Sequence, residues 1–121
     1  MREHAKLRAF DLADEIALET YRETRRFPKE EAYGLTSQMR RAAVSVPSNI
    51  VEGCARESQA EYLRFLEIAF GSLRELNYQC SLASRLDYFE GETSMALLSK
   101  ISEAEKVLGA LIRSLRPQLQ P

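Results

Sequence analysis

The chain has little of what most catalytic and metal sites require. Its 121 residues include one histidine, His4, and no Glu-x-x-His pair of the kind that binds two metals inside helical bundles. A zinc set of four His and Cys ligands cannot be assembled from one chain, and no glycine-rich phosphate loop follows a strand. No nucleophile, base and orienting group come together in the pattern. We therefore expect no catalytic residue, no metal and no cofactor.

Cysteine is also scarce, and Cys54 and Cys80 are the only two. Each is flanked by apolar residues on a helical pattern. The pattern favours two small buried side chains in a reducing compartment. A disulfide or a two-thiolate metal site is the alternative.

Long apolar runs are absent. Residues 1–10 are charged and lack the apolar core of a signal peptide. No stretch approaches the roughly 18 continuous apolar residues that a membrane span requires. These absences predict a cytoplasmic protein without a membrane contact.

The charge balance is nearly neutral, with 17 basic and 18 acidic residues and a net charge of -1. A protein whose whole surface binds nucleic acid would be basic. Of the 17 basic residues 13 are arginine, which suits bidentate contacts to carboxylates or phosphates. The balance leaves room for ion pairs or for a local basic patch.

What the chain does have is helical periodicity in one domain, residues 1–121, with only five Gly and four Pro to interrupt it. Four helices are predicted, over about residues 7–26, 36–54, 59–86 and 93–115. Short connections between long helices predict an all-α, antiparallel, up-down-up-down four-helix bundle. On the first helix the predicted core stripe is Phe10, Ala13, Ala17 and Tyr21, widened by Leu18. On the second it is Leu35, Met39, Ala42, Ala43, Val46, Ile50, Val51 and Cys54.

Local signals place the helix boundaries. Thr36 is a candidate N-cap for the second helix, Ser58 and Glu61 form a capping box for the third, and Glu92 or Thr93 is expected to cap the fourth. Pro47 lies inside the second helix, where proline removes a backbone hydrogen bond, so a kink is predicted near Val46.

The third helix is apolar on more than one side. Leu63 and Phe70 lie off its main stripe, and Gly71 sits in mid-helix, where glycine costs about 1 kcal/mol against alanine. Close approach of another backbone would explain this glycine. These three residues are therefore predicted to pack between subunits, with a cover of loop residues as the alternative.

A second surface feature is a cluster of cations between positions 22 and 41. Several phosphates could be bound by Arg25, Arg26, Lys29, Arg40 and Arg41 on one surface. The alternative is that Arg40 and Arg41 pair with glutamates of a neighbouring helix or subunit.

Two segments carry a resemblance to a bacterial family. FPKEEAYGLTSQMRRAAVSVPSNIVEG (27–53) and EYLRFLEIAFGSLRELNYQ (61–79) resemble the hallmark segments of the 23S rRNA-intervening-sequence proteins, also called four-helix bundle proteins. The resemblance implies an antiparallel four-helix bundle that assembles as a ring-like homopentamer. The family name refers to the genomic position of some members, within rRNA genes.

The family that the chain resembles has a related branch, the accessory variability determinant of diversity-generating retroelements. That branch is a basic pentameric barrel that works with nucleic acid, and the net charge of -1 departs from it. Together these features predict a non-enzymatic, self-assembling scaffold or accessory protein that forms a homopentamer. The alternative is an accessory protein that binds RNA or DNA through its arginine-rich patch.

Overall fold

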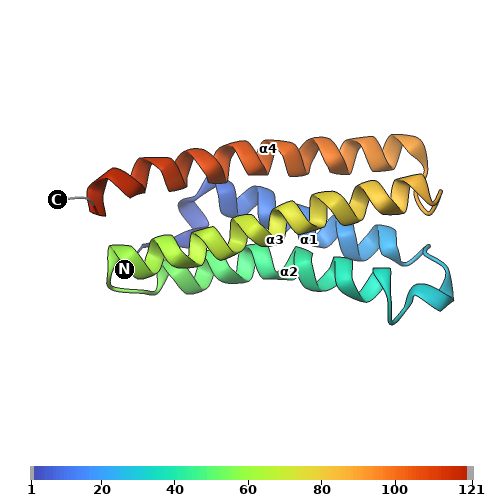
Figure 1. The fold of residues 1–121 in the computed structure, drawn as a ribbon, viewed down its shortest axis with the longest axis horizontal. Coiled ribbons are helices and arrows are strands. Elements are labelled where there is room, and N and C mark those ends of the chain that lie inside the picture. Colours follow the sequence, from blue (N-terminus) through green and yellow to red (C-terminus); the bar gives the residue numbers. More distant parts are fainter. Residues whose placement is uncertain (1, 120–121) are drawn as a thin grey trace.

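The structure is a computed structural model that describes residues 2–119. Within that range the chain is all-helical, and Figure 1 shows four long helices lying side by side. They are α1 (Arg8–Thr24), α2 (Leu35–Cys54), α3 (Gln59–Arg85) and α4 (Gly91–Leu115). Three short 3-10 helices accompany them, η1 (His4–Lys6), η2 (Lys29–Glu31) and η3 (Arg116–Leu119). The predicted four-helix, all-α fold is confirmed.

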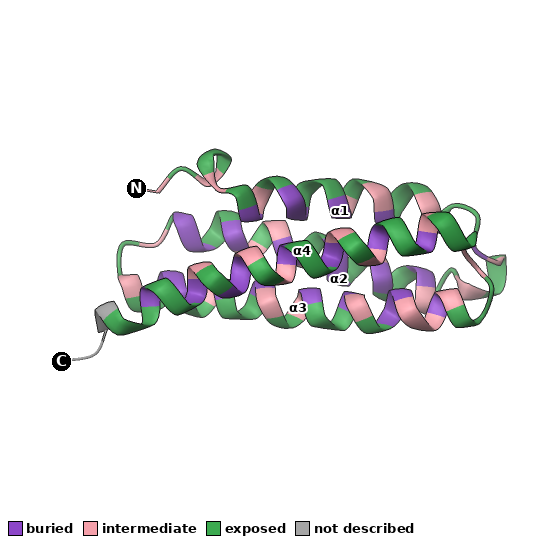
Figure 2. Cartoon of the chain, turned by 90° about the horizontal axis from the view of Figure 1, so that it is seen from above, coloured by how far each residue is buried: buried purple, intermediate pink, exposed green. Residues whose placement is uncertain are grey.

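The helices enclose one hydrophobic core. Each long helix contacts the next one along the chain, and α4 also contacts α1. The colour gradient of Figure 1 runs along the bundle and back, so successive helices point in alternate directions. Buried segments recur along all four helices in Figure 2. None of the helices described between residues 2 and 119 is both long enough and apolar enough to cross a membrane.

The core stripe of α1 differs from the predicted one. Its buried residues are Ala9, Leu12, Ala13, Ile16, Thr20 and Thr24. Tyr21, expected in the core, is 41% exposed. The hydroxyls of Thr20 and Thr24 donate 2.7 Å hydrogen bonds to the carbonyls four residues earlier, which satisfies them inside the core. Threonine can therefore replace an apolar residue at a buried helical position, and the prediction of Tyr21 was wrong.

The helix α2 begins one residue earlier than predicted, and Thr36 is not its cap. The Leu35 amide donates a 3.0 Å hydrogen bond to Oε1 of Glu31, so a carboxylate four residues earlier satisfies the free N–H of the first turn. Thr36 is buried instead. At the fourth helix no side chain caps the start, which lies at Gly91 rather than at residue 93.

Pro47 does not interrupt α2, which continues from Leu35 to Cys54. The predicted kink near Val46 stays a prediction. The Asn49 side chain donates to the Ser45 carbonyl at 2.8 Å, within the turn that contains the proline. Val51, predicted in the core, is 38% exposed.

The start of α3 follows the prediction. The Glu61 amide donates a 3.0 Å hydrogen bond to Oγ of Ser58, as expected of a capping box.

The helices α2 and α3 approach each other closely. A 2.8 Å hydrogen bond between the hydroxyls of Ser45 and Ser72 joins α2 to the middle of α3. Gly53 lets the two helices approach, because a Cβ there would lie 2.9 Å from Cβ of Phe65.

Candidate nucleic-acid interface and association surfaces

Three of the five predicted cations lie in the connection between α1 and α2. The side chains of Arg25, Arg26 and Lys29 are exposed. None of them makes an ion pair or a side-chain hydrogen bond with another residue between 2 and 119. The same holds for Arg22, one turn earlier on α1. The end of α1 and the connection that follows it therefore carry four free positive charges.

Arg40 has a structural role instead. Its Nε donates a 2.8 Å hydrogen bond to Oγ1 of Thr24, and one terminal nitrogen donates to the carbonyl of Tyr21 at 3.3 Å. The guanidinium lies 4.8 Å from the centre of the Tyr21 ring. These contacts attach the first turns of α2 to the last turns of α1, so Arg40 is only partly available to a ligand.

Arg41 points elsewhere, since consecutive helical residues are about 100° apart. It donates to Oε1 of Gln38 at 3.0 Å and lines a small groove of about 120 Å³ between α2 and α3. Ser45, Ser72 and Glu75 line the same groove. Neither Arg40 nor Arg41 forms an ion pair with a glutamate within residues 2–119. The structure thus gathers Arg25, Arg26 and Lys29 on one connection and separates Arg40 from Arg41.

Several other basic residues form ion pairs within the protein. Ion pairs join Arg8 to Glu103, Arg56 to Glu52, Arg74 to Glu105, Arg116 to Glu67, and Lys100 to both Glu15 and Glu19. Lys100 lies 2.6 Å from Glu19, and that hydrogen bond raises the pKa of the lysine. The cations at the end of α1 differ from these residues, because none of them has an acidic partner within residues 2–119.

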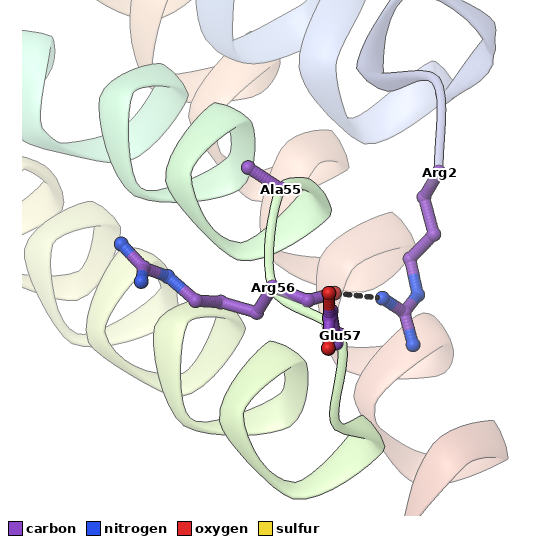
Figure 3. Close-up of a pocket in the computed structure, with 4 residues that line it drawn as sticks. All are labelled: Arg2, Ala55, Arg56 and Glu57. Carbon is purple, nitrogen blue, oxygen red and sulfur yellow. Dashed lines mark hydrogen bonds between the residues drawn. The ribbon is translucent and has the colours of Figure 1, made fainter.

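A surface hollow of about 540 Å³ near the end of α2 does not bring free cations together. It is lined by Arg2, Ala55, Arg56 and Glu57. Figure 3 shows the guanidinium of Arg2 reaching the carbonyl of Arg56, at 2.8 Å, while the Arg56 side chain extends away from it. Arg2 also donates to Gln59 at 2.6 Å. Both arginines have protein partners, so the hollow is not an anion site built from converging cations.

The three residues predicted to pack between subunits differ in their surroundings. Leu63 is buried in the core of its own chain, so the predicted second apolar face does not include it. Phe70 is half-buried and packs near Gly109 of α4, where a Cβ would lie 3.6 Å from its ring. Gly71 is exposed, and a Cβ there would meet nothing within 4 Å. Only Gly71 faces open space.

An apolar surface that the sequence pattern did not identify lies between α1 and α2. Leu18 is 49% exposed, and with Tyr21 and Val44 it lines a shallow groove of about 200 Å³. Val51 is exposed further along α2. Periodicity alone could not separate this surface from the core, because apolar residues lie on both sides of the helix. The signal that could have found it is the flanking of Leu18 by Asp14 and Arg22, which are four residues away on either side.

The side chains that could ligate a metal are dispersed. Across residues 2–119, no three His, Cys, Asp or Glu side chains come together in a group that could hold an ion. Cys54 and Cys80 are buried and free, as predicted.

Comparisons with known proteins give one family and one fold. The family model described as 23S rRNA-intervening sequence protein matches residues 5–110. A crystal structure of a protein with unknown function, from the S23 ribosomal protein family of Bacteroides thetaiotaomicron VPI-5482, is similar with a TM-score of 0.77. It is 23% identical, and the similarity covers 86% of this chain and 97% of that one, which shows the shared fold. No curated protein sequence gives a significant match.

Proposed function

This chain belongs to the 23S rRNA-intervening sequence protein family, and we propose that it is a non-enzymatic scaffold or accessory protein that assembles into a homopentamer. The observation that carries self-assembly is the exposed apolar surface on α1, α2 and α3. Large apolar side chains exposed on these helices are Leu18, Tyr21, Val44, Val51, Ile68 and Tyr78. Leu18, Tyr21 and Val44 line one groove together, and apolar side chains gathered in this way on a surface favour a protein partner. The number of five subunits rests on the family resemblance.

Gly71 supports an assembly contact on α3. Glycine in mid-helix costs about 1 kcal/mol against alanine, and nothing in residues 2–119 outside its own turn of helix lies within 4 Å of the position of a Cβ at Gly71. Nothing inside the protomer therefore offsets that loss. A neighbouring subunit packed against this side would need the space.

The experiment is a mass measurement by light scattering over a range of concentrations. Five chains of 13.8 kDa give about 69 kDa. A single species of 13.8 kDa at every concentration would overturn self-assembly, and a stable mass other than the pentamer would overturn the number of five.

A matched pair of variants tests the contact at Gly71. Gly71→Leu adds bulk on the open side, and we expect it to reduce the mass to that of smaller species. Ala60→Leu adds bulk at another exposed position of α3 and serves as the control. An unchanged mass in Gly71→Leu would show that no subunit packs there.

The second candidate function is binding of RNA or DNA. The observation that favours it is the group of free, exposed cations Arg25, Arg26 and Lys29. Arg41 adds a charge on the neighbouring α2–α3 side, and Arg40 contributes mainly through its contacts to α1. Phosphate contacts by such residues are strongly weakened by salt.

A binding assay with structured RNA at low and moderate salt tests this candidate. The triple change Arg25→Glu, Arg26→Glu and Lys29→Glu should abolish binding, and Arg41→Glu should weaken it. Arg113→Glu on α4 is the control, because Arg113 is exposed and also free of an ion pair within the described chain. Binding that survives the triple change would show that these residues are not the contact.

A further inference from the structure

The exposed face of α1 changes its chemistry along the helix. It is acidic near the start, apolar in the middle and basic near the end, in the order Asp11, Asp14, Leu18, Tyr21, Arg22 and Arg25. Arg25 directly follows the last residue of α1 and keeps helical backbone angles, so it continues this face. All six residues are exposed. Such a gradient along one helix face is complementary to itself when the direction is reversed.

The charges of this face have no partner within the described part of their own protomer. Asp11, Asp14, Arg22 and Arg25 make no ion pair or side-chain hydrogen bond with any other residue between 2 and 119. Glu15 and Glu19 of the same helix, in contrast, pair with Lys100 of α4. These two glutamates beside α4 therefore have a partner in their own protomer, whereas the four charges of the exposed face have none within residues 2–119.

Four of these residues have the spacing of a helix-pairing seam. The intervals between Asp14, Leu18, Tyr21 and Arg25 are four, three and four residues, the repeat that keeps side chains on one side of a helix facing a second helix. At about 100° per residue, all four lie within an arc of roughly 60°. A partner helix can therefore contact the four side chains together.

A groove is present at the middle of this seam. Asp14, Leu18 and Tyr21 line the shallow groove between α1 and α2, together with Ala17 and Val44. Arg40 lies over the Tyr21 ring and binds its carbonyl, which holds the tyrosine in place. The groove offers apolar contact beside the carboxylate of Asp14, and Arg25 follows Tyr21 by one helical turn outside it.

We propose that the exposed face of α1 binds the same face of a second copy of this chain, with the two helices antiparallel and related by a twofold axis. Leu18 then lies opposite Tyr21 of the partner subunit, and Asp14 lies opposite Arg25 of the partner subunit. By symmetry each of these contacts occurs twice. A parallel arrangement would set Asp against Asp and Arg against Arg, so the charges select the antiparallel one.

This contact does not rest on the proposed pentamer. A cyclic pentamer has no twofold axis, so the α1 contact joins two protomers when no ring forms, and two pentamers when one does. A single helix pair buries little surface, and the contact is therefore weak and concentration-dependent. It also covers Arg25, so association and phosphate binding at that residue compete.

A charge exchange measured by sedimentation equilibrium tests the proposal on the full chain. Asp14→Arg places arginine opposite arginine, and Arg25→Asp places aspartate opposite aspartate. Each variant alone should weaken association about tenfold or more. The double variant, Asp14→Arg with Arg25→Asp, restores opposite charges and should associate as the unchanged protein does. Mixing the two single variants should also restore association, because each supplies the charge that the other needs.

The controls are Glu92→Arg and Arg113→Asp, which make the same changes of charge at exposed positions of α4. They should leave the association unchanged, and circular dichroism should show equal helicity in all variants. Failure of the double variant and of the mixture to recover would overturn the proposal, as would an unchanged protein that shows no twofold association. If a ring forms, its own mass should survive Asp14→Arg, so the fates of the pentamer and of the α1 contact are read separately.

Discussion

The phenol of Tyr88 donates a 2.8 Å hydrogen bond to Oε2 of Glu31, although 57 residues separate them in the chain. The other carboxylate oxygen of Glu31 accepts the Leu35 amide at 3.0 Å. One side chain thus starts α2 and also binds the turn between α3 and α4. The ring of Phe27 packs beside it, with centres 5.3 Å from Tyr88 and 5.0 Å from Phe89. Residues 27–35, the first part of the hallmark segment 27–53, therefore have a structural role, which is to close one end of the bundle.

Tyr88→Phe should lower the urea midpoint of unfolding. The change keeps the ring that packs on Phe27 and removes only the hydroxyl that donates to Glu31. Tyr78→Phe is the control, because Tyr78 is 59% exposed and its hydroxyl makes no hydrogen bond within residues 2–119. Equal midpoints for the two variants would contradict a stabilising role of the Tyr88 hydrogen bond.

Stability should also depend on pH through Glu31. Hydrogen bonds from the Leu35 amide and then from Tyr88 hold the pKa of Glu31 below its usual 4.5. A pKa lower in the folded state means that the ionised carboxylate favours folding. The contribution is complete above pH 4.5 and is lost as the pH falls through the folded value. Glu31→Gln should flatten this part of the stability profile, whereas Glu30→Gln, at an exposed neighbouring position, should leave it intact.

Gly53→Ala should destabilise the protein by about 1–3 kcal/mol, because overpacking forces two helices apart. A Cβ at position 53 would lie 2.9 Å from Cβ of Phe65 and 3.3 Å from the Tyr62 carbonyl oxygen. Neither atom is the end of a flexible side chain, so α2 and α3 must separate. Urea unfolding measures the effect.

Gly71→Ala, in contrast, should stabilise the isolated protomer. The site is open on its own chain, so alanine gains about 0.5–1 kcal/mol of helix stability without a clash. The contrast between the two glycines is the test, and equal effects would show that the spacing of α2 and α3 is not limited by residue 53.

Arg40→Ala should lower stability by about 1 kcal/mol and Arg41→Ala should not. Arg40 loses its hydrogen bonds to Thr24 and Tyr21, and the buried hydroxyl of Thr24 loses a contact. Arg41 is exposed, and within the described part of the chain its side chain donates a hydrogen bond to Gln38 of its own helix and to no other residue. Thermal unfolding of the two variants compares them, and a larger effect at Arg41 would contradict the assignment.

Both thiols should resist alkylation in the native protein. Burial raises the pKa of Cys80 to about 12 and also raises the pKa of Cys54, so little thiolate is present at pH 8. Iodoacetamide should modify neither residue until urea is added. Rapid modification of the folded protein would show that one of the two sites opens.

The sequence predicted the helices well and their faces less well. The Ser58 cap and the predicted core stripe of α2 from Met39 to Ile50 follow from local pattern and lie as expected. Tyr21 and Val51 were assigned to the core although both are exposed, because a mean stripe does not say how wide the buried arc is. Thr20 and Thr24 are buried because their hydroxyls bond the helix backbone, which composition does not reveal.

The candidate nucleic-acid interface was also predictable only in part from the sequence. Exposure of Arg25, Arg26 and Lys29 follows from their position at a helix end and in a connection, where few side chains are buried. The separation of Arg40 from Arg41 could not be seen in the sequence, since it depends on Thr24 and Tyr21 of another helix. Leu63 was placed on an outer face because its burial depends on how neighbouring helices pack around α3.

By itself the sequence determined four helices, their approximate ends and their all-α packing, because periodicity and the few Gly and Pro residues act locally along the chain. Only the tertiary structure decided which charges remain free. An ion pair such as Lys100 with Glu19 joins residues 81 positions apart, and its partner is fixed by the packing of α4 on α1. The same packing leaves Asp14 and Arg25 without partners on the exposed face of α1, and it leaves Gly71 open on α3. The surfaces available to a second copy are therefore those whose side chains find no partner within the folded protomer.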